Sequence, residues 1–319
     1  MKVFYLEDEK LDLVSVIIPT YNREIKIVNR AIKSTLNQTY KKLEIIIVDD
    51  NIDDKISSDL KLLINKFDDN RIIYHKNKEN IGGAESRNRG IDIANGQYIS
   101  FLDDDDFFLS EKIEKQVKYM KAKKVDFVIS NLAIIDNKMK VKDIRKFNWF
   151  DRHQYNNKEL LINHYKYHLT GTPTFMFKKN MLINLKGFPN VEMGHEFHLV
   201  DRALKNDYKL GYVNEILTVA YLHNGERIST NNNRQRQLNN LLEFKLKNIN
   251  NLNRKDKYQI YHRHYVASTF DHLNNRRLLK SLKSIFLAFL YKPTSFLYQF
   301  FKIITIKIYN KGVNLDDKK

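Results

Sequence analysis

The run YISFLDDDD at residues 98–106 decides how this sequence folds and where its chemistry lies. Residues 98–102 are a short apolar run typical of a strand buried on both faces, and Asp103 to Asp106 follow it without a spacer. Four adjacent carboxylates repel one another, so such a turn is costly unless a cation neutralises it. Hard divalent cations prefer carboxylate oxygens and commonly share their coordination with substrate phosphates. The alternative interpretation is a solvated acidic turn that caps the following helix.

Three more apolar runs precede this strand, and amphipathic patterns separate them. Runs rich in β-branched residues predict buried strands, whereas apolar residues spaced three and four apart predict helices. The alternation predicts βαβ units and a mostly parallel sheet, in which ligands bind beyond the carboxyl ends of the strands. The expected strands lie at residues 13–18, 43–48 and 71–75, and the expected helices at residues 27–36, 56–67 and 84–94.

The residues that follow these strands carry groups suited to a nucleotide. Tyr21 offers a flat face on which a base can stack, and Asp50 can accept a hydrogen bond from a ring N–H such as that of uracil. Arg87 lies behind Gly82-Gly83 at the start of an expected helix, where it can meet a diphosphate. The alternatives are an Asx turn at Asp50 and a solvated helix charge at Arg87.

The rest of the chain divides into two parts. Residues 111–230 mix short strands with helices, which predicts an α+β continuation on the same sheet. Residues 231–319 are helical and basic, and Leu278, Leu282, Ile285 and Phe289 share one apolar face. A second apolar stripe runs over residues 296–308. In the middle part we expect strands at residues 125–131, 172–177, 209–213 and 217–222 and a helix at residues 196–205.

Composition excludes several classes of protein. The 319 residues are 42% hydrophobic, which is enough to bury the core of one large domain or two small ones. There is no cysteine, so disulfides and thiolate metal sites are excluded and a metal must be held by oxygen or nitrogen. We recognise no signal peptide at the N-terminus and no apolar run near the roughly 20 residues of a spanning helix.

The net charge of +17 is placed unevenly. It is about −4 over residues 1–110, about +8 over residues 111–230 and about +13 over residues 231–319. The basic excess lies beside bulky apolar residues in the tail, which favours an anionic membrane surface as partner. Nucleic acid is disfavoured, because the acidic strand ends would repel phosphate. The alternative is that the apolar stripe packs on the α/β part of the same chain or on a second subunit.

Four motifs in order resemble family 2 glycosyltransferases of the GT-A fold, of the type that builds bacterial cell-surface polysaccharides. The resemblance covers residues 13–110 well and residues 170–230 loosely, and it does not extend to the tail. The motifs are Val14 to Arg23, Ser34 to Tyr40 with Glu44 to Asp50, Asn80 to Ile91, and Gly96 to Asp106.

This resemblance implies an α/β GT-A fold with a mostly parallel, Rossmann-like sheet. Residues 1–110 would form the half that binds the nucleotide sugar, and residues 111–230 the α+β half that binds the acceptor. Residues 231–319, which the resemblance does not cover, are expected from their own pattern to form a basic amphipathic helical tail. The implied enzyme is an inverting hexosyl- or N-acetylhexosaminyltransferase. It would use Mn²⁺ or Mg²⁺ and move a sugar from a nucleotide sugar, often a UDP-sugar, to a glycan or lipid-linked acceptor. The expected location is the cytoplasm, with the protein attached peripherally to the inner face of the cell membrane. The sequence does not decide whether the protein forms a homo-oligomer.

The resemblance also assigns the site residues. Glu196 takes the position of the general base, although the family pattern there is Glu-Asp and this chain has His195-Glu196. The alternative is that Glu196 only interacts with the dipole of its helix. The implied metal ligands are Asp103, Asp105 and His223, and the implied donor-binding residues are Pro19, Thr20, Tyr21, Asn22, Asp50, Arg87, Asp103 and Asp104.

Two other classes stay open at this point. A nucleotidyltransferase of related architecture would also bind a nucleotide and a metal, but it usually has a Gly-rich signature with Arg and Lys after the first strand. This chain has Pro19-Thr20-Tyr21-Asn22 there. A non-catalytic basic module for membranes or nucleic acid is the second alternative.

Overall fold

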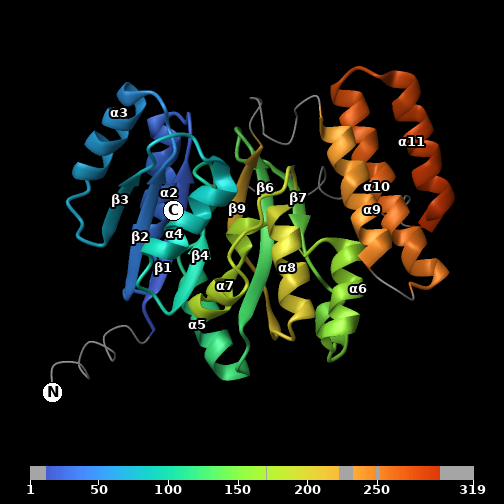
Figure 1. Cartoon of the computed structure of the whole chain (residues 1–319), viewed down its shortest axis with the longest axis horizontal. Helices are drawn as coiled ribbons and strands as arrows, with labels where there is room; N and C mark the ends of the chain where they lie inside the picture. The colour runs from blue at the N-terminus through green and yellow to red at the C-terminus, as the bar shows by residue number, and fades with distance from the viewer. Residues whose placement is uncertain (1–11, 170, 223–232, 249–251, 295–319) are drawn as a thin grey trace.

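The apolar runs of the first half become parallel strands of one sheet. β1 (Val14–Thr20) pairs in parallel with β2 (Leu43–Asp49) and β4 (Tyr98–Phe101), and β2 pairs in parallel with β3 (Ile72–Lys76). Every residue of β2 and β4 is buried, because helices cover both faces. The carboxyl ends of β1, β2 and β4 therefore lie side by side at one edge of the sheet (Figure 1).

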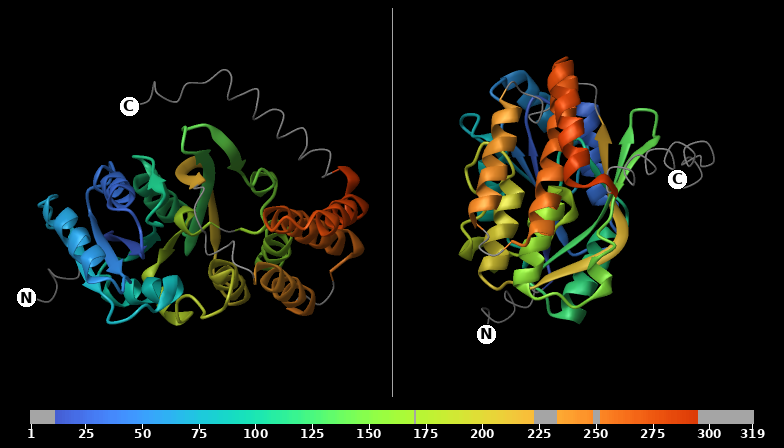
Figure 2. Two further views of the ribbon diagram at one scale, coloured as in Figure 1. Left: turned by 90° about the horizontal axis from the view of Figure 1, so that it is seen from above. Right: turned by 90° about the vertical axis from the view of Figure 1, so that its right-hand side faces the viewer.

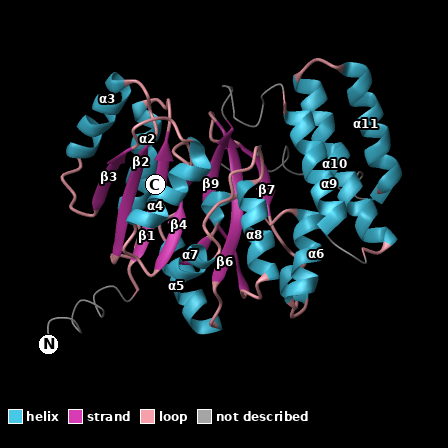
Figure 3. Cartoon of the chain, viewed as in Figure 1, coloured by secondary structure: helices cyan, strands magenta, loops and turns pink. Residues whose placement is uncertain are grey.

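The computed structural model describes residues 12–169, 171–222, 233–248 and 252–294. Figure 3 shows how helices and strands alternate along these residues. The expectations for the N-terminal segment and for the apolar stripe at residues 296–308 lie outside the described residues.

The second half extends the same sheet with mixed pairing. The strand order is β3-β2-β1-β4-β8-β6-β9-β5, and β7 pairs with β6. β8 is antiparallel to both β4 and β6, β6 is parallel to β9, and β5 is antiparallel to β9. These strands are β5 (Phe107–Phe108), β6 (Phe127–Asp136), β7 (Val141–Arg145), β8 (Met176–Lys178) and β9 (Leu210–Leu222).

Helices cover the two faces of the sheet and bury one apolar cluster on each (Figure 2). α2, α3 and α5 contribute to the cluster that contains Val28 and Val117, whereas α4, α7 and α8 contribute to the cluster that contains Phe101 and Leu199. α4 lies so close to β1 that a Cβ on Gly90 would be 2.4 Å from Cγ2 of Ile17. These helices are α2 (Ile25–Leu36), α3 (Asp54–Asn65), α4 (Gly82–Ile93), α5 (Lys112–Lys123), α7 (Lys179–Asn184) and α8 (His195–Lys205).

Three helices form the end of the molecule beyond β7 (Figures 1 and 2). They are α9 (Arg234–Asn248), α10 (Arg254–Asn274) and α11 (Leu278–Tyr291), and they meet the sheet domain at α6 (Asn157–Tyr167) and α8. The contact is a small apolar cluster in which Tyr165 and Phe197 pack with Leu241 and Ile260. Among the described residues, no helix is long and apolar enough to cross a bilayer.

The structure confirms the predicted α/β class with a mostly parallel sheet and a helical C-terminal part. Two local predictions were wrong. Residues 172–177 begin with a 3-10 turn (Thr172–Thr174) rather than a strand, because Pro173 has no N–H to donate to a ladder. The two strands expected at residues 209–213 and 217–222 are one strand, β9, which stays continuous across a register shift opposite Asn131.

Candidate active site

The acidic turn after β4 is fixed at both ends. The N–H of Asp106 donates to the carbonyl of Asp103 (3.0 Å), and the Asp106 carboxylate accepts the N–H of Tyr221 at the end of β9 (3.2 Å). Asp104 and Asp106 are buried, whereas the side chains of Asp103 and Asp105 are 32% and 22% exposed. The turn therefore presents two carboxylates to the carboxyl edge of the sheet.

Two arginines neutralise this turn. Nε of Arg23 lies 2.9 Å from Oδ1 of Asp104, and its terminal nitrogen lies 3.1 Å from Oδ2 of Asp105. Arg87, from the second turn of α4, pairs with Asp103. Burial raises the pKa of the Asp104 carboxyl to about 6, the charge of Arg23 opposes the rise, and the charge of Asp105 adds to it. Burial acts to lower the pKa of Arg23, but Asp104 and Asp105 hold it above its usual value.

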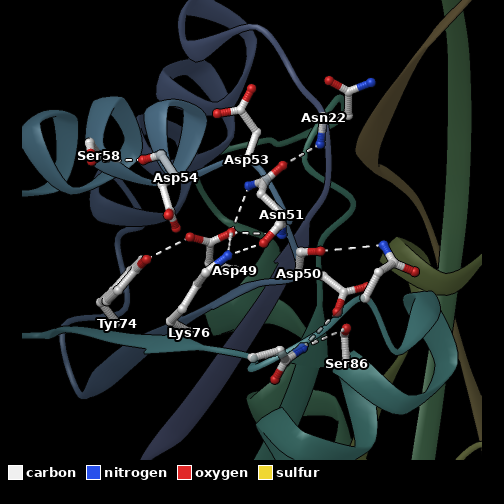
Figure 4. A network of polar contacts seen from close by, with 12 residues as sticks. Asn22, Asp49, Asp50, Asn51, Asp53, Asp54, Ser58, Tyr74, Lys76 and Ser86 are labelled. Atoms are coloured by element: carbon white, nitrogen blue, oxygen red, sulfur yellow. Dashed lines mark hydrogen bonds and ion pairs between the residues drawn. The ribbon is translucent and has the colours of Figure 1, made fainter.

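Asp50 holds the start of α4 against β2. Its Oδ1 accepts bonds from Nδ2 of Asn77 and the N–H of Ile81, and its Oδ2 accepts the N–H of Gly82, all at 2.9 Å. The side chain is almost fully buried. Figure 4 shows this carboxylate between the end of β2 and the first turn of α4. Asp50 thus satisfies helix-terminal N–H groups that would otherwise lack partners.

The turn after β1 approaches the acids from the other side. The side chain of Thr20 makes a hydrogen bond to Asp104, and Pro19 pairs with Val48 within the sheet. Asn22 adopts a left-handed backbone (φ 48°), and its N–H donates to Oδ1 of Asn51 (Figure 4). The ring of Tyr21 is 49% exposed and is therefore free to stack on a planar group.

The segment before α8 joins the start of this helix to α4. The side-chain amide of Asn88 accepts from the N–H of Phe188 (2.7 Å) and donates to its carbonyl (2.9 Å). Gly187 precedes this pair with φ +60°, and a Cβ there would lie 2.2 Å from Oδ1 of Asn88. Nδ1 of His195 contacts the carbonyl of Pro189 (3.1 Å). The first turn of α8, which carries Glu196, is thus tied to the helix that carries Arg87.

The structure brings most of the predicted site residues to one edge. Thr20, Asp50, Arg87 and Asp103 to Asp105 surround the carboxyl ends of β1, β2 and β4. Glu196 lies in the first turn of α8, half-buried, and makes no hydrogen bond or ion pair with any residue that the structure describes. His223 lies outside the described residues. Within the described part of the chain, no group of three or more histidine, aspartate or glutamate side chains is arranged so that it could hold a metal ion.

Three residues of this region, Arg23, Asn77 and Asn88, had no role assigned to them from the sequence. Arg23 closes the motif after the first strand, and its positive charge next to a predicted acidic site is the signal that could have found it. Asn77 and Asn88 carry no such signal, because their partners are set only by how α4 meets β2 and the segment before α8.

A sheet with this strand order and this acidic edge is the arrangement of a GT-A glycosyltransferase. The sequence model of glycosyl transferase family 2 matches residues 15–185, and the chain belongs to this family. The protein is therefore a glycosyltransferase, which excludes the nucleotidyltransferase and the non-catalytic module.

Known relatives extend the comparison. The chain is 35% identical over 208 residues to an uncharacterised glycosyltransferase of Methanocaldococcus jannaschii, which covers 64% of this chain and 69% of that one. It is 44% identical over 124 residues to WfaP of Escherichia coli, a UDP-Glc:α-D-GlcNAc-diphosphoundecaprenol β-1,3-glucosyltransferase, covering 39% of this chain and 47% of that one. The chain thus spans about half the length of WfaP.

Two solved structures share the fold. TarS of S. aureus in complex with UDP-GlcNAc has a TM-score of 0.60 at 17% identity, covering 89% of this chain and 82% of that one. The mannosyltransferase PcManGT from Pyrobaculum calidifontis, in complex with GDP-Man and Mn²⁺, has a TM-score of 0.52 at 18% identity, covering 96% and 88%. At these identities the likeness concerns the fold alone.

Proposed function

We propose that the protein is an inverting, metal-dependent transferase that moves a hexosyl or N-acetylhexosaminyl group from a UDP-sugar to a hydroxyl of a glycan or lipid-linked acceptor. One observation carries the proposal. The acidic turn and the guanidinium of Arg87 meet at the carboxyl ends of the parallel strands, Tyr21 lies in the adjoining turn after β1, and the segment before α8 ties the helix that carries Glu196 to α4.

The side chains of the turn suit a divalent cation. Asp103 and Asp105 offer partly exposed oxygen donors, and Mn²⁺ or Mg²⁺ is commonly held by one or two carboxylates together with phosphates and water. His223 would add a nitrogen ligand from the segment that follows Tyr221. A cation bound here stabilises the charge that builds on the leaving diphosphate.

The donor's diphosphate and base have separate partners. Nε of Arg87 is buried and has no hydrogen-bond partner among the described residues, so a phosphate that draws this guanidinium away from Asp103 would give the N–H a partner. Oδ2 of Asp50 accepts one bond within the described chain, from Gly82, and a carboxylate oxygen has room for a second donor such as the ring N–H of uracil. Tyr21 would stack on the base, Pro19 and Asn22 would shape the turn around it, and Thr20 would hold Asp104 toward the ribose and diphosphate.

Glu196 is the proposed general base. Its carboxylate would take the proton from the acceptor hydroxyl while that oxygen attacks the anomeric carbon from the face opposite the diphosphate. A single displacement of this kind inverts the anomeric configuration. Because Glu196 has no ion pair or hydrogen bond within the described chain, its lone pairs are not already engaged.

The outward face of α11 supports peripheral attachment to the inner surface of the membrane, where a lipid-linked acceptor would be carried. α11 buries Ser281, Ser284 and Ala288 and exposes Leu279 (84%) and Phe286 (59%), with lysines between the exposed apolar residues. Such an apolar face with interleaved cations suits an anionic bilayer surface. A second copy is the weaker partner, because α11 contains no acid to meet the lysines of another α11.

A thermal-shift panel tests the donor. Ligands that bind only the folded state raise its apparent stability, so UDP-glucose or UDP-GlcNAc with Mn²⁺ is expected to raise Tm, and the same ligands without Mn²⁺ are not. Asp105→Asn should abolish the shift, whereas Asp69→Asn, in an ion pair with Arg71 elsewhere, should retain it. A shift with GDP-mannose alone would refute the choice of base, and no shift with any nucleotide sugar would refute the donor assignment.

A further inference from the structure

The acids proposed to hold a cation already have positive partners. One guanidinium, that of Arg23, bridges Asp104 and Asp105, and a second, that of Arg87, takes Asp103. The positive charge that Asp103 and Asp105 require is therefore supplied by the chain itself.

Arg23 is held in this place by its backbone. It follows Asn22, whose left-handed conformation is fixed by the bond from its N–H to Asn51. The turn itself is held by Arg30 of α2, which donates to the carbonyl of Asp105 (2.5 Å) and stacks on the ring of Tyr221, 3.6 Å from its centroid. The ion pair thus joins two segments whose backbones are both anchored.

A bare divalent cation and these guanidiniums compete for the same carboxylate oxygens. A cation that binds Asp105 either displaces Arg23 or comes to lie beside its positive charge, and both outcomes weaken binding. A nucleoside diphosphate removes the conflict, because its phosphates accept guanidinium N–H bonds and add negative charge. Nε of Arg87 has no hydrogen-bond partner within the described part of the chain, so a phosphate oxygen would give this N–H a partner.

We propose that Arg23, with Arg87, pairs with the acids in place of the metal when no nucleotide is bound, so that a divalent cation binds tightly only together with a nucleoside diphosphate that draws the guanidiniums onto its phosphates. This inference rests on the proposed function. By linkage, the cation raises the affinity for the nucleotide by the same factor as the nucleotide raises the affinity for the cation.

The test measures Mn²⁺ binding to the full chain by electron paramagnetic resonance, with and without UDP or GDP. A protein-free titration corrects for Mn²⁺ that the nucleotide itself complexes. We expect UDP to tighten Mn²⁺ binding to the wild-type protein at least about tenfold. Arg23→Gln is expected to bind Mn²⁺ without nucleotide at least about tenfold more tightly than the wild type, and to lose most of the dependence on UDP.

Lys26→Gln is the matched control. It removes the same charge close to Arg23, but the Lys26 side chain is 80% exposed and pairs with Glu24. It is expected to behave as the wild type, which separates the effect of the ion pair from that of net charge. If Arg23→Gln does not fold, Arg23→Lys takes its place, because a single ammonium cannot reproduce the fork over two carboxylates and should also bind bare Mn²⁺ more tightly.

The outcomes separate this inference from the proposed function. If Mn²⁺ fails to bind the wild type both with and without nucleotide, the metal role of Asp103 and Asp105 is refuted. If Mn²⁺ binds the wild type equally with and without nucleotide, or if the Arg23 variants bind bare Mn²⁺ no better than the wild type, the role given to Arg23 is refuted while the metal site stands.

Discussion

His164→Gln is expected to make the folded protein less sensitive to mild acid. His164 is fully buried at the contact between α6 and α8. Its Nε2 bonds the carbonyl of Phe197 (2.9 Å), its Nδ1 accepts the N–H of Leu169 (3.2 Å), and its ring stacks on Phe197 with centroids 4.1 Å apart. A glutamine offers one acceptor and one donor for the same two partners but does not titrate.

The magnitude follows from the protonation of this one ring. Burial lowers the pKa of His164 from 6.5 to about 3. Below pH 6.5 the His164 ring is therefore protonated in the unfolded chain but stays neutral in the folded protein, so the free energy of unfolding falls as the pH falls. At pH 5 this one group costs about 2 kcal/mol relative to neutral pH. Burial also lowers the pKa values of His168 and His264, the latter to about 4, so the contact between α6, α8 and α10 adds further losses of the same sign.

Urea unfolding followed by circular dichroism at pH 7.5 and pH 5 measures the effect. Between pH 7.5 and pH 5, the free energy of unfolding of the variant should fall by about 2 kcal/mol less than that of the wild type. At pH 7.5 the variant should be about 1–2 kcal/mol less stable than the wild type, because the stacked ring is gone. Contributions from the carboxylates cancel in this comparison. His153→Gln, at a ring 60% exposed to solvent, is the control and should leave the slope unchanged. An unchanged slope in His164→Gln would show that the ring is charged or solvated in the folded protein.

Three further changes test the site and its surroundings. Glu196→Gln should retain donor binding in the thermal-shift assay and lose transfer by a factor of about 10² to 10⁴, because the acceptor proton has no base. Gly187→Ala should lower the free energy of unfolding by about 1–3 kcal/mol and reduce transfer, since it strains a left-handed backbone and pushes against Asn88 at 2.2 Å. Leu279→Glu combined with Phe286→Glu should release the protein from phosphatidylglycerol vesicles in a flotation assay.

Each of these has a contrary result. Unreduced transfer by Glu196→Gln would place the base elsewhere. A fully stable Gly187→Ala would mean that the segment before α8 can move away from α4. If the α11 double variant floats with the vesicles as well as the wild type does, the proposal that α11 binds the membrane is refuted. Ile183→Glu, at a side chain 54% exposed on α7, is the control expected to float normally.

The sequence predicts this fold well where periodicity alone decides the structure. The runs that became β1 and β2 are apolar apart from Ser15 and Glu44, which bond each other, as expected for strands covered on both faces. The four adjacent carboxylates directly after β4 likewise allowed the acidic turn to be predicted from the sequence. The strand expected at residues 172–177 was placed too early, and only its end overlaps β8, because Pro173 and the shortness of β8 leave too little periodic signal to set its start.

Contacts between distant residues were beyond sequence reasoning. The charge of Arg23 signals an acidic partner, but nothing local indicates that this partner is Asp104, 81 residues away. Likewise, nothing local indicates that Asp50 accepts N–H bonds from Ile81 and Gly82 at the start of α4. The sequence predicted the apolar stripe of α11, but not whether this stripe faces the rest of the protein or the solvent. Leu278, Leu282 and Phe289 are exposed, and the helix packs instead through its small residues.

The pairing of β5 with β9 limits how the specificity of this enzyme can be re-engineered. The two residues that follow the acidic turn pair with β9, a strand more than a hundred positions later in the chain. A chimaera that takes everything after residue 111 from a relative would therefore also replace the strand that holds the turn in place. Grafts confined to the connections between strands, or to the three C-terminal helices, leave the pairing of β5 with β9 unchanged. Segments exchanged with a relative are therefore best taken from what borders the sheet rather than from the sheet itself.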